Sequence, residues 1–101
     1  MTDFNIKPKY LQELRTIFNN YCPKSTIWAY GSRVGGDSHD GSDLDLAVKT
    51  FGDKNCSLAK LKEILNDSDI PFLIDILEFD NISESFQKEI LKNYIEIFPN
   101  L

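Results

Sequence analysis

A short run of alternating apolar and acidic residues near the middle of the chain most constrains its fold. Leu44, Leu46 and Val48 alternate with Asp43 and Asp45, which is the period of two of a β-strand. The aliphatic side chains therefore leave one face of a strand. The two carboxylates leave the other, roughly 6.6 Å apart along it at ~3.3 Å per residue. Such a pair can share a hard cation such as Mg²⁺, which takes oxygen ligands and leaves room for phosphate.

The dipeptide Gly31-Ser32 precedes this run and follows a stretch of β-branched and aromatic residues, Ser25–Tyr30. Glycine permits a tight turn. We expect Ser32–Val34 to start a short helical turn, whose unpaired N–H groups favour phosphate. The Ser32 hydroxyl adds a donor, and Arg33 either contacts phosphate or pairs with an acid of the following loop. Alone, Gly-Ser predicts only a capped turn, but beside two acids it predicts a phosphate site.

A third acid, Asp75, lies within the apolar run Phe72–Glu78. A single carboxylate is costly to bury without a partner. If this run forms a strand beside the first one, Asp75 joins Asp43 and Asp45. The three carboxylates would repel one another without metal. With one or two divalent ions they form a site that neutralises a triphosphate and activates an attacking oxygen. The alternative is an edge position or a structural salt bridge for Asp75.

Hydrophobic periodicity predicts a single α/β domain over residues 1–101, with a mixed β-sheet and helices mainly on one face. The main helices are expected, with proline or serine at their starts, at Pro8–Tyr21, Leu58 to about Asp67, and Glu84 to about Asn93. The strands are expected at Ser25–Tyr30, Asp43–Lys49, Phe72–Glu78 and Tyr94–Phe98. Residues 35–42 read as a polar loop with an Asp40-Gly41 turn and a solvated His39.

Charge and cysteine usage limit the partners and the compartment. The net charge of −5 and the pI near 4.7 disfavour nucleic acid as a partner, because nucleic-acid binding needs a basic surface. The start of the chain is polar and does not resemble a signal peptide, and no apolar run approaches a membrane span. Cys22 and Cys56 form no metal or redox motif. We therefore expect two free thiols in a cytoplasmic protein.

These residues carry a family resemblance. Gly31-Ser32, then Asp43-x-Asp45 and a later Asp75, resemble the nucleotidyltransferase superfamily of DNA polymerase β and kanamycin nucleotidyltransferase. The fuller run G-S-R-V-G-G…S-D-L-D-L-A-V is similar to that of the minimal nucleotidyltransferases, or MNT proteins, and the resemblance covers nearly the whole chain. One departure is Gly35, where many relatives carry a basic residue that can contact phosphate.

The resemblance implies a role for each site residue. Asp43 and Asp45 would hold Mg²⁺, and Asp75 would be the base for the acceptor hydroxyl or a third metal ligand. Ser32, with Gly31 and Arg33, would bind the nucleotide and its terminal phosphates. The implied reaction transfers a nucleoside monophosphate, AMP from ATP, to a hydroxyl and releases pyrophosphate.

The resemblance also implies a protein partner. We expect no second domain that would orient an acceptor, and a transferase must orient both substrates. MNT proteins are often paired with a small helical HEPN-type protein as a toxin–antitoxin pair, in which the transferase is the antitoxin. Two alternatives remain. The chain is the catalytic subunit for a small-molecule hydroxyl, with a separate substrate-binding subunit in a homo- or hetero-oligomer. Or it is a non-catalytic module that neutralises its partner by contact.

Overall fold

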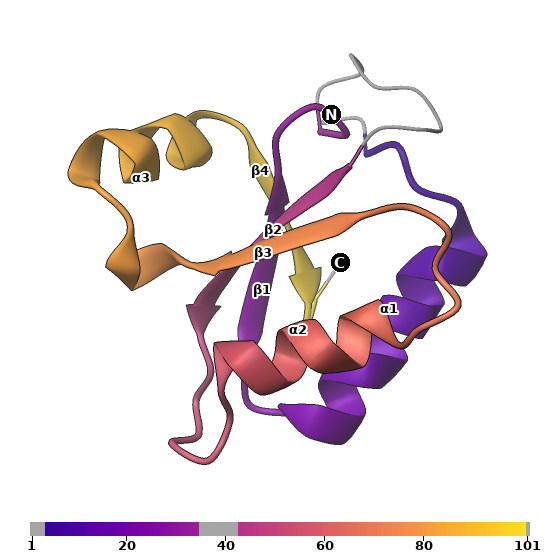
Figure 1. Cartoon of the computed structure of the whole chain (residues 1–101). Helices are drawn as coiled ribbons and strands as arrows, with labels where there is room; N and C mark the ends of the chain where they lie inside the picture. Colours follow the sequence, from indigo (N-terminus) through magenta and orange to yellow (C-terminus); the bar gives the residue numbers. More distant parts are fainter. Residues whose placement is uncertain (1–3, 35–42, 101) are drawn as a thin grey trace.

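The computed structural model describes residues 4–34 and 43–100 (Figure 1). The predicted loop at 35–42, with Gly35, His39 and the Asp40-Gly41 turn, lies outside the described residues. Within the described ranges the elements, in chain order, are α1 (Pro8–Tyr21), β1 (Thr26–Tyr30), β2 (Leu44–Thr50), α2 (Leu58–Asn66), β3 (Ile74–Glu78), the 3-10 helix η1 (Phe79–Asn81), α3 (Glu84–Lys92) and β4 (Tyr94–Phe98).

The predicted helix starts are confirmed by their capping contacts. Pro8 occupies the first turn of α1, where its missing N–H costs nothing. The Ser57 hydroxyl accepts a hydrogen bond from Lys60 N at 3.2 Å, and the Ser83 hydroxyl accepts one from Phe86 N at 3.2 Å. Each serine therefore satisfies one of the N–H groups that a helix leaves unpaired at its start.

Three strands differ from the predicted bounds. β1 begins at Thr26 rather than at Ser25. β2 is shifted by one residue, and β3 begins at Ile74 rather than at Phe72. The ring of Phe72 packs edge-to-face against Tyr10 of α1, with centroids 5.6 Å apart, and Arg33 lies over it. These contacts with other segments hold Phe72 outside the strand, which the local apolar pattern could not indicate.

The four strands form one mixed sheet in the order β3-β2-β1-β4. β1 pairs antiparallel with both β2 and β4. β2 and β3 run parallel, so α2 forms the crossover between them, as a parallel pair requires. The expected mixed α/β sheet is confirmed.

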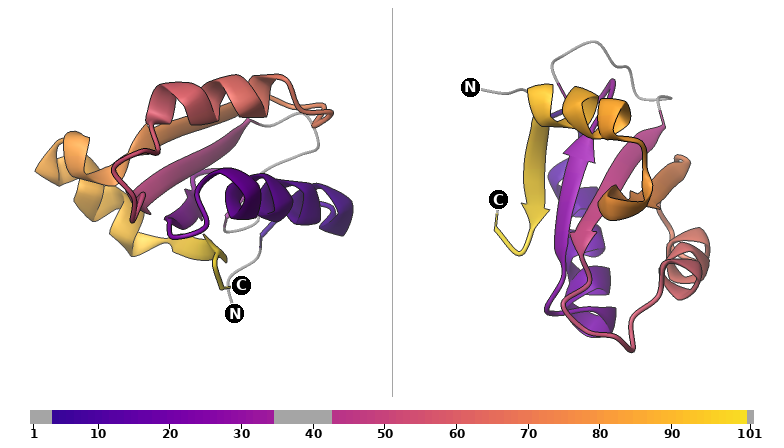
Figure 2. Two further views of the ribbon diagram at one scale, coloured as in Figure 1. Left: turned by 90° about the horizontal axis from the view of Figure 1, so that it is seen from below. Right: turned by 90° about the vertical axis from the view of Figure 1, so that its left-hand side faces the viewer.

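The two faces of the sheet bury different helices. The larger core joins α1 and α2 to one face, through buried side chains that include Leu14, Phe18, Leu61, Leu65, Ile27, Leu44, Leu46, Val48 and Ile76. On the opposite face, Trp28 and Tyr30 pack with Phe79 of η1 and Ile90 of α3. Figure 2 shows α1 behind the strands and α3 in front of their upper ends. In the described part of the chain, no helix is both long and apolar enough to cross a membrane.

Candidate active site

Two of the predicted acids, Asp45 and Asp75, are neighbours at one end of the sheet, on the face that carries α3. Asp45 of β2 and Asp75 of β3 are direct partners in the parallel register, with neighbouring strands about 4.8 Å apart. Asp45 is also the antiparallel partner of Tyr30, whose other neighbour is Tyr94. A row of two carboxylates and two phenols therefore crosses the sheet in the order Asp75, Asp45, Tyr30 and Tyr94. Asp43 is exposed and lies just before the first residue of β2.

The carboxylates create a negative potential, which contributes to the raised pKa values of Asp45 and Tyr30. Burial raises the pKa of Asp45, and the charges of Asp75 and Asp43 raise it further. Tyr30 is 9% exposed, and burial, followed by the charges of Asp45 and Asp75, raises its pKa to about 12. These shifts follow from desolvation and from like charges placed close together. A cation at this end of the sheet would relieve the repulsion.

Gly31 allows the chain to pass directly beside Asp45. Its φ is +82°, in the left-handed region where side chains are strained. A Cβ at this position would collide with the Asp45 carboxylate oxygen Oδ2. Glycine is therefore required both for the turn and for the approach to the acid. Ser32 follows it and is exposed, so its hydroxyl is accessible at the same end of the sheet.

The expected short helical turn at Ser32–Val34 is present as a single turn, from which no helix continues within the described residues up to 34. The segment is a turn closed by a hydrogen bond from Val34 N to Gly31 O at 3.0 Å. Val34 forms an isolated antiparallel bridge with Phe4, and Asn5 N donates to Arg33 O at 2.7 Å. These contacts with the N-terminal segment keep the backbone extended at Val34, where the turn ends. The groups available to bind phosphate are therefore those of the turn and the Ser32 hydroxyl, without a helix dipole.

Arg33 is 3% exposed and braces three segments. Its Nη1 donates to Asn5 O at 2.7 Å, and its guanidinium lies 4.2 Å from the centroid of the Phe72 ring. The side chain thus ties the turn to the N-terminal segment and to the approach to β3. A direct phosphate contact for Arg33 remains a prediction, which this buried placement does not favour.

The donor set suits Mg²⁺. Carboxylate oxygens are the ligands that this ion prefers, and it is commonly held by one or two carboxylates together with substrate phosphates. Over the described residues, no group of three or more His, Cys, Asp or Glu side chains is arranged to hold a metal ion. A site of two aspartates completed by phosphate matches the chemistry of the ion. Asp43 and Asp45 are the candidates for the pair, with Asp75 beside them.

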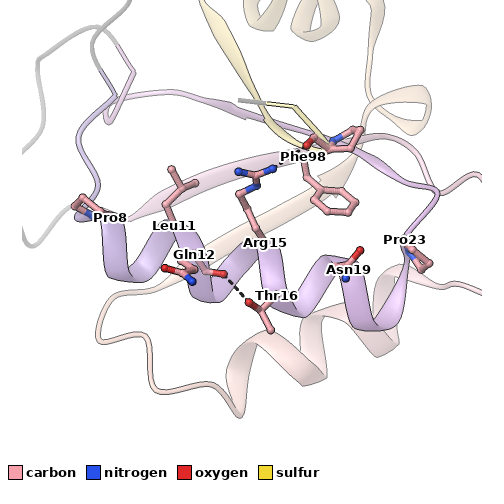
Figure 3. A pocket seen from close by; sticks show the side chains of 9 residues that line it. Pro8, Leu11, Gln12, Arg15, Thr16, Asn19, Pro23 and Phe98 are labelled. Atoms are coloured by element: carbon pink, nitrogen blue, oxygen red, sulfur yellow. Dashed lines mark hydrogen bonds between the residues drawn. The ribbon is translucent and has the colours of Figure 1, made fainter.

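A larger pocket lies elsewhere on the described part of the chain. It has a volume of about 650 Å³ between α1 and the end of β4, and Arg15 closes it by donating from Nη2 to Pro99 O at 2.9 Å (Figure 3). Its described lining residues include no acid. It therefore lacks the groups that bind a divalent ion, and size alone does not make it the reaction site.

Side chains of α3 complete the site region without any signal in the sequence. In the sequence, Phe86 is predicted only as part of a helix and Asn93 only as the end of that helix. The structure places both around a pocket beside Tyr30 and Gly31. Their proximity depends on which face of the sheet α3 covers, and local periodicity does not determine that face.

Three comparisons with known proteins bear on the family and on the fold. A family model described as "Polymerase beta, Nucleotidyltransferase" matches residues 12–100. A Haemophilus influenzae protein named "Probable protein adenylyltransferase MntA" is 38% identical over 101 residues, which cover 96% of this chain and 89% of that protein. A solved structure described as "Crystal structure of the toxin-antitoxin with AMP-PNP" has a TM-score of 0.64 at 22% identity, and covers 87% of this chain and 72% of its own. This last likeness concerns the fold.

Proposed function

The chain belongs to the polymerase β nucleotidyltransferase family, and from this premise we propose that it is a Mg²⁺-dependent adenylyltransferase that transfers AMP from ATP to a hydroxyl of a partner protein. The observation that carries the proposal is the register pairing of Asp45 with Asp75. It places two carboxylates beside the turn of Gly31 and Ser32.

The reaction is an in-line displacement at the α-phosphorus of ATP. The acceptor oxygen forms a bond to phosphorus, the bond from that phosphorus to the β-phosphate oxygen breaks, and pyrophosphate leaves with the electron pair. Asp75 is exposed at the edge strand β3, and we assign it the proton of the attacking hydroxyl. Ser32 and the N–H groups of its turn hold the terminal phosphates.

Asp43 and Asp45 are the proposed ligands of Mg²⁺, which when bound supplies positive charge against the triphosphate. The pKa of Asp45 is raised first by burial and then by the charges of Asp75 and Asp43, and such a carboxylate gains from a nearby cation, which supports this assignment. Catalysis of this kind consists of positioning and charge neutralisation, which a domain of this size can provide.

The proposed partner is a small helical HEPN-type toxin encoded nearby, with this chain as its antitoxin. The name of the Haemophilus protein supports protein adenylylation, and the described toxin–antitoxin complex supports the pairing. We place the pair in the cytoplasm, which suits the free cysteines Cys22 and Cys56.

The test is a transfer assay with ATP labelled at the α-phosphate, Mg²⁺ and the helical protein encoded beside this chain. Label should appear on that protein and fall on the order of 100-fold or more in Asp45→Asn and Asp75→Asn. Asp80→Asn is the matched control, since Asp80 is an exposed acid paired with Lys49 at 3.8 Å outside the row of acids.

Equal labelling by wild type and Asp45→Asn would contradict the proposed role of the acids. Co-elution of the two proteins without label would favour neutralisation by contact. Label on an added small-molecule alcohol instead of the protein would identify the chain as the catalytic subunit for a small acceptor.

A further inference from the structure

A second pocket adjoins the candidate active site. It has a volume of about 330 Å³ and lies between the end of β1 and α3, where it is lined by Tyr30, Gly31, Phe86, Glu89, Ile90 and Asn93. Figure 2 shows α3 crossing in front of this end of β1. Because Gly31 also contacts the Asp45 side chain, the pocket and the acids share one wall.

The pocket presents aromatic and aliphatic surface. The rings of Tyr30 and Phe86 meet edge to face with centroids 5.9 Å apart, and the buried Ile90 lies beside them. Phe86 is 39% exposed, although an aromatic ring gains from burial. An aromatic base can stack on such a ring, and loss of one stacking ring weakens binding about 5- to 150-fold.

Its polar groups suit an uncharged ligand better than a phosphate. The Asn93 side chain donates from Nδ2 to Val34 O at 3.3 Å, which orients the amide and leaves its oxygen as an acceptor. Glu89 adds a carboxylate, which Lys92 bonds at 2.9 Å. The described residues that line the pocket include no basic side chain. An amide oxygen and a carboxylate accept hydrogen bonds from the N–H groups of a base edge, whereas the carboxylate would repel phosphate.

The order Asp75, Asp45, Tyr30 across the sheet indicates whether the pocket beside Tyr30 takes the nucleotide or the acceptor. Asp75 lies at one end, on edge strand β3, and Tyr30 with the pocket lies beyond Asp45 on the other side. In an in-line displacement the acceptor and the pyrophosphate occupy opposite sides of the α-phosphate. The acceptor approaches Asp75, and the Gly31-Ser32 turn takes the terminal phosphates. The pocket adjoins that turn, so its occupant belongs to the nucleotide.

We propose that this pocket binds the nucleobase of the nucleoside triphosphate, with Phe86 as the stacking surface. The inference rests on the proposed function, because it assumes that a nucleotide is the substrate. It adds a base-binding site to the phosphate and metal groups, and it assigns α3 to substrate recognition rather than to packing alone.

Calorimetric titration with two ligands tests the proposal. Wild-type protein in Mg²⁺ is titrated with ATP and with inorganic tripolyphosphate, which has the phosphates without the base. Phe86→Ala should weaken ATP binding about 10-fold, which corresponds to the lower part of the stacking range, and leave tripolyphosphate binding unchanged. Phe86→Leu keeps apolar volume but removes the ring, and should act in the same direction.

Leu91→Ala is the matched control. Leu91 lies on α3, is 50% exposed and does not line the pocket, so both affinities should be as in wild type. Unchanged ATP affinity in both Phe86 variants would overturn the base site and leave the proposed function intact. Equal weakening of both ligands would also overturn it, because the ring would then act through the fold. If wild type binds neither ligand, the proposed function fails together with this inference.

Discussion

Asp45 and Asp75 stand directly opposite each other on adjacent parallel strands, on the same face and at the same end of the sheet. Like charges in this position repel, and both burial and its acidic neighbours raise the pKa of Asp45. The fold thus holds an unfavourable pair in place, which is what a cation-binding site requires.

Replacing Asp45 by Asn should stabilise the metal-free protein. The repulsion disappears, and we expect a gain of about 0.5–1 kcal/mol, or about 2–6 °C in the unfolding midpoint measured in EDTA. The raised pKa means that the stabilising contribution of protonated Asp45 is present below its unfolded pKa and is lost as pH rises through its folded pKa. The gain should therefore grow with pH across that interval.

The same variant should remove stabilisation by Mg²⁺. Wild type should gain about 1.4 kcal/mol at a tenfold excess of free Mg²⁺ over its Kd, and Asp45→Asn should gain far less. Asp80→Asn, whose acid pairs with Lys49 on the surface, should match wild type in both EDTA and Mg²⁺. A lower midpoint for Asp45→Asn in EDTA would show that the acid pair is not repulsive.

Gly31→Ala should damage both the fold and the metal site. The added methyl group meets the Asp45 carboxylate at a residue with φ of +82°, and we expect a loss of about 1–3 kcal/mol in the free energy of unfolding. Gly52→Ala is the matched control, because Gly52 has φ of +68° and its Cβ would meet the backbone of Lys24 instead. Both variants should unfold at lower temperature, but only Gly31→Ala should lose affinity for Mg²⁺ in calorimetry. Equal Mg²⁺ affinities would contradict the assigned contact.

Tyr30 should ionise well above the usual range of a tyrosine. Its pKa is raised from 10.0 to about 12, so the stability that its neutral form contributes is present below about pH 10 and is lost as pH rises through about 12. Absorbance titration of phenolate should show one late component, which Tyr30→Phe removes. Asp45→Asn should move that component to lower pH, and an unmoved component would mean that the charge of Asp45 does not contribute to this pKa.

Arg33→Ala should act mainly on stability. Loss of the charged hydrogen bond to Asn5 O and of the contact with the Phe72 ring should cost about 2 kcal/mol in the free energy of unfolding. Tripolyphosphate affinity, measured by calorimetry below the unfolding transition, should change less than in Ser32→Ala. A larger loss of tripolyphosphate affinity in Arg33→Ala would restore the direct phosphate contact expected from the sequence.

Local patterns were sufficient for the elements and for much of the site. The alternation of Leu44, Leu46 and Val48 correctly predicted a strand with an apolar face. The position of Asp75 within an apolar run indicated a second strand, whose carboxylate requires an interacting partner. The sequence did not determine whether these two strands are neighbours in the sheet. The parallel register in the structure supplies the adjacency.

Long-range contacts explain what sequence reasoning could not predict. The turn at Ser32–Val34 and the burial of Arg33 depend on the N-terminal segment through Phe4 and Asn5. The position of α3 depends on which face offers Trp28 and Phe79 to Ile90. Helical periodicity shows that α3 has an apolar side but not which face of the sheet will cover it.

The parallel pairing of β2 with β3 also has a consequence for the order of folding. Asp45 pairs with Tyr30 through the local β1–β2 ladder, but Asp75 joins it only after α2 has carried the chain across the sheet. Contacts between residues so distant in sequence form late, because a long loop must close first. A chain that has folded only as far as β2 therefore has Asp43 and Asp45 without Asp75 beside them. The Asp45–Asp75 pair therefore forms only once β2, α2 and β3 are in place, and the proposed catalysis depends on that unit.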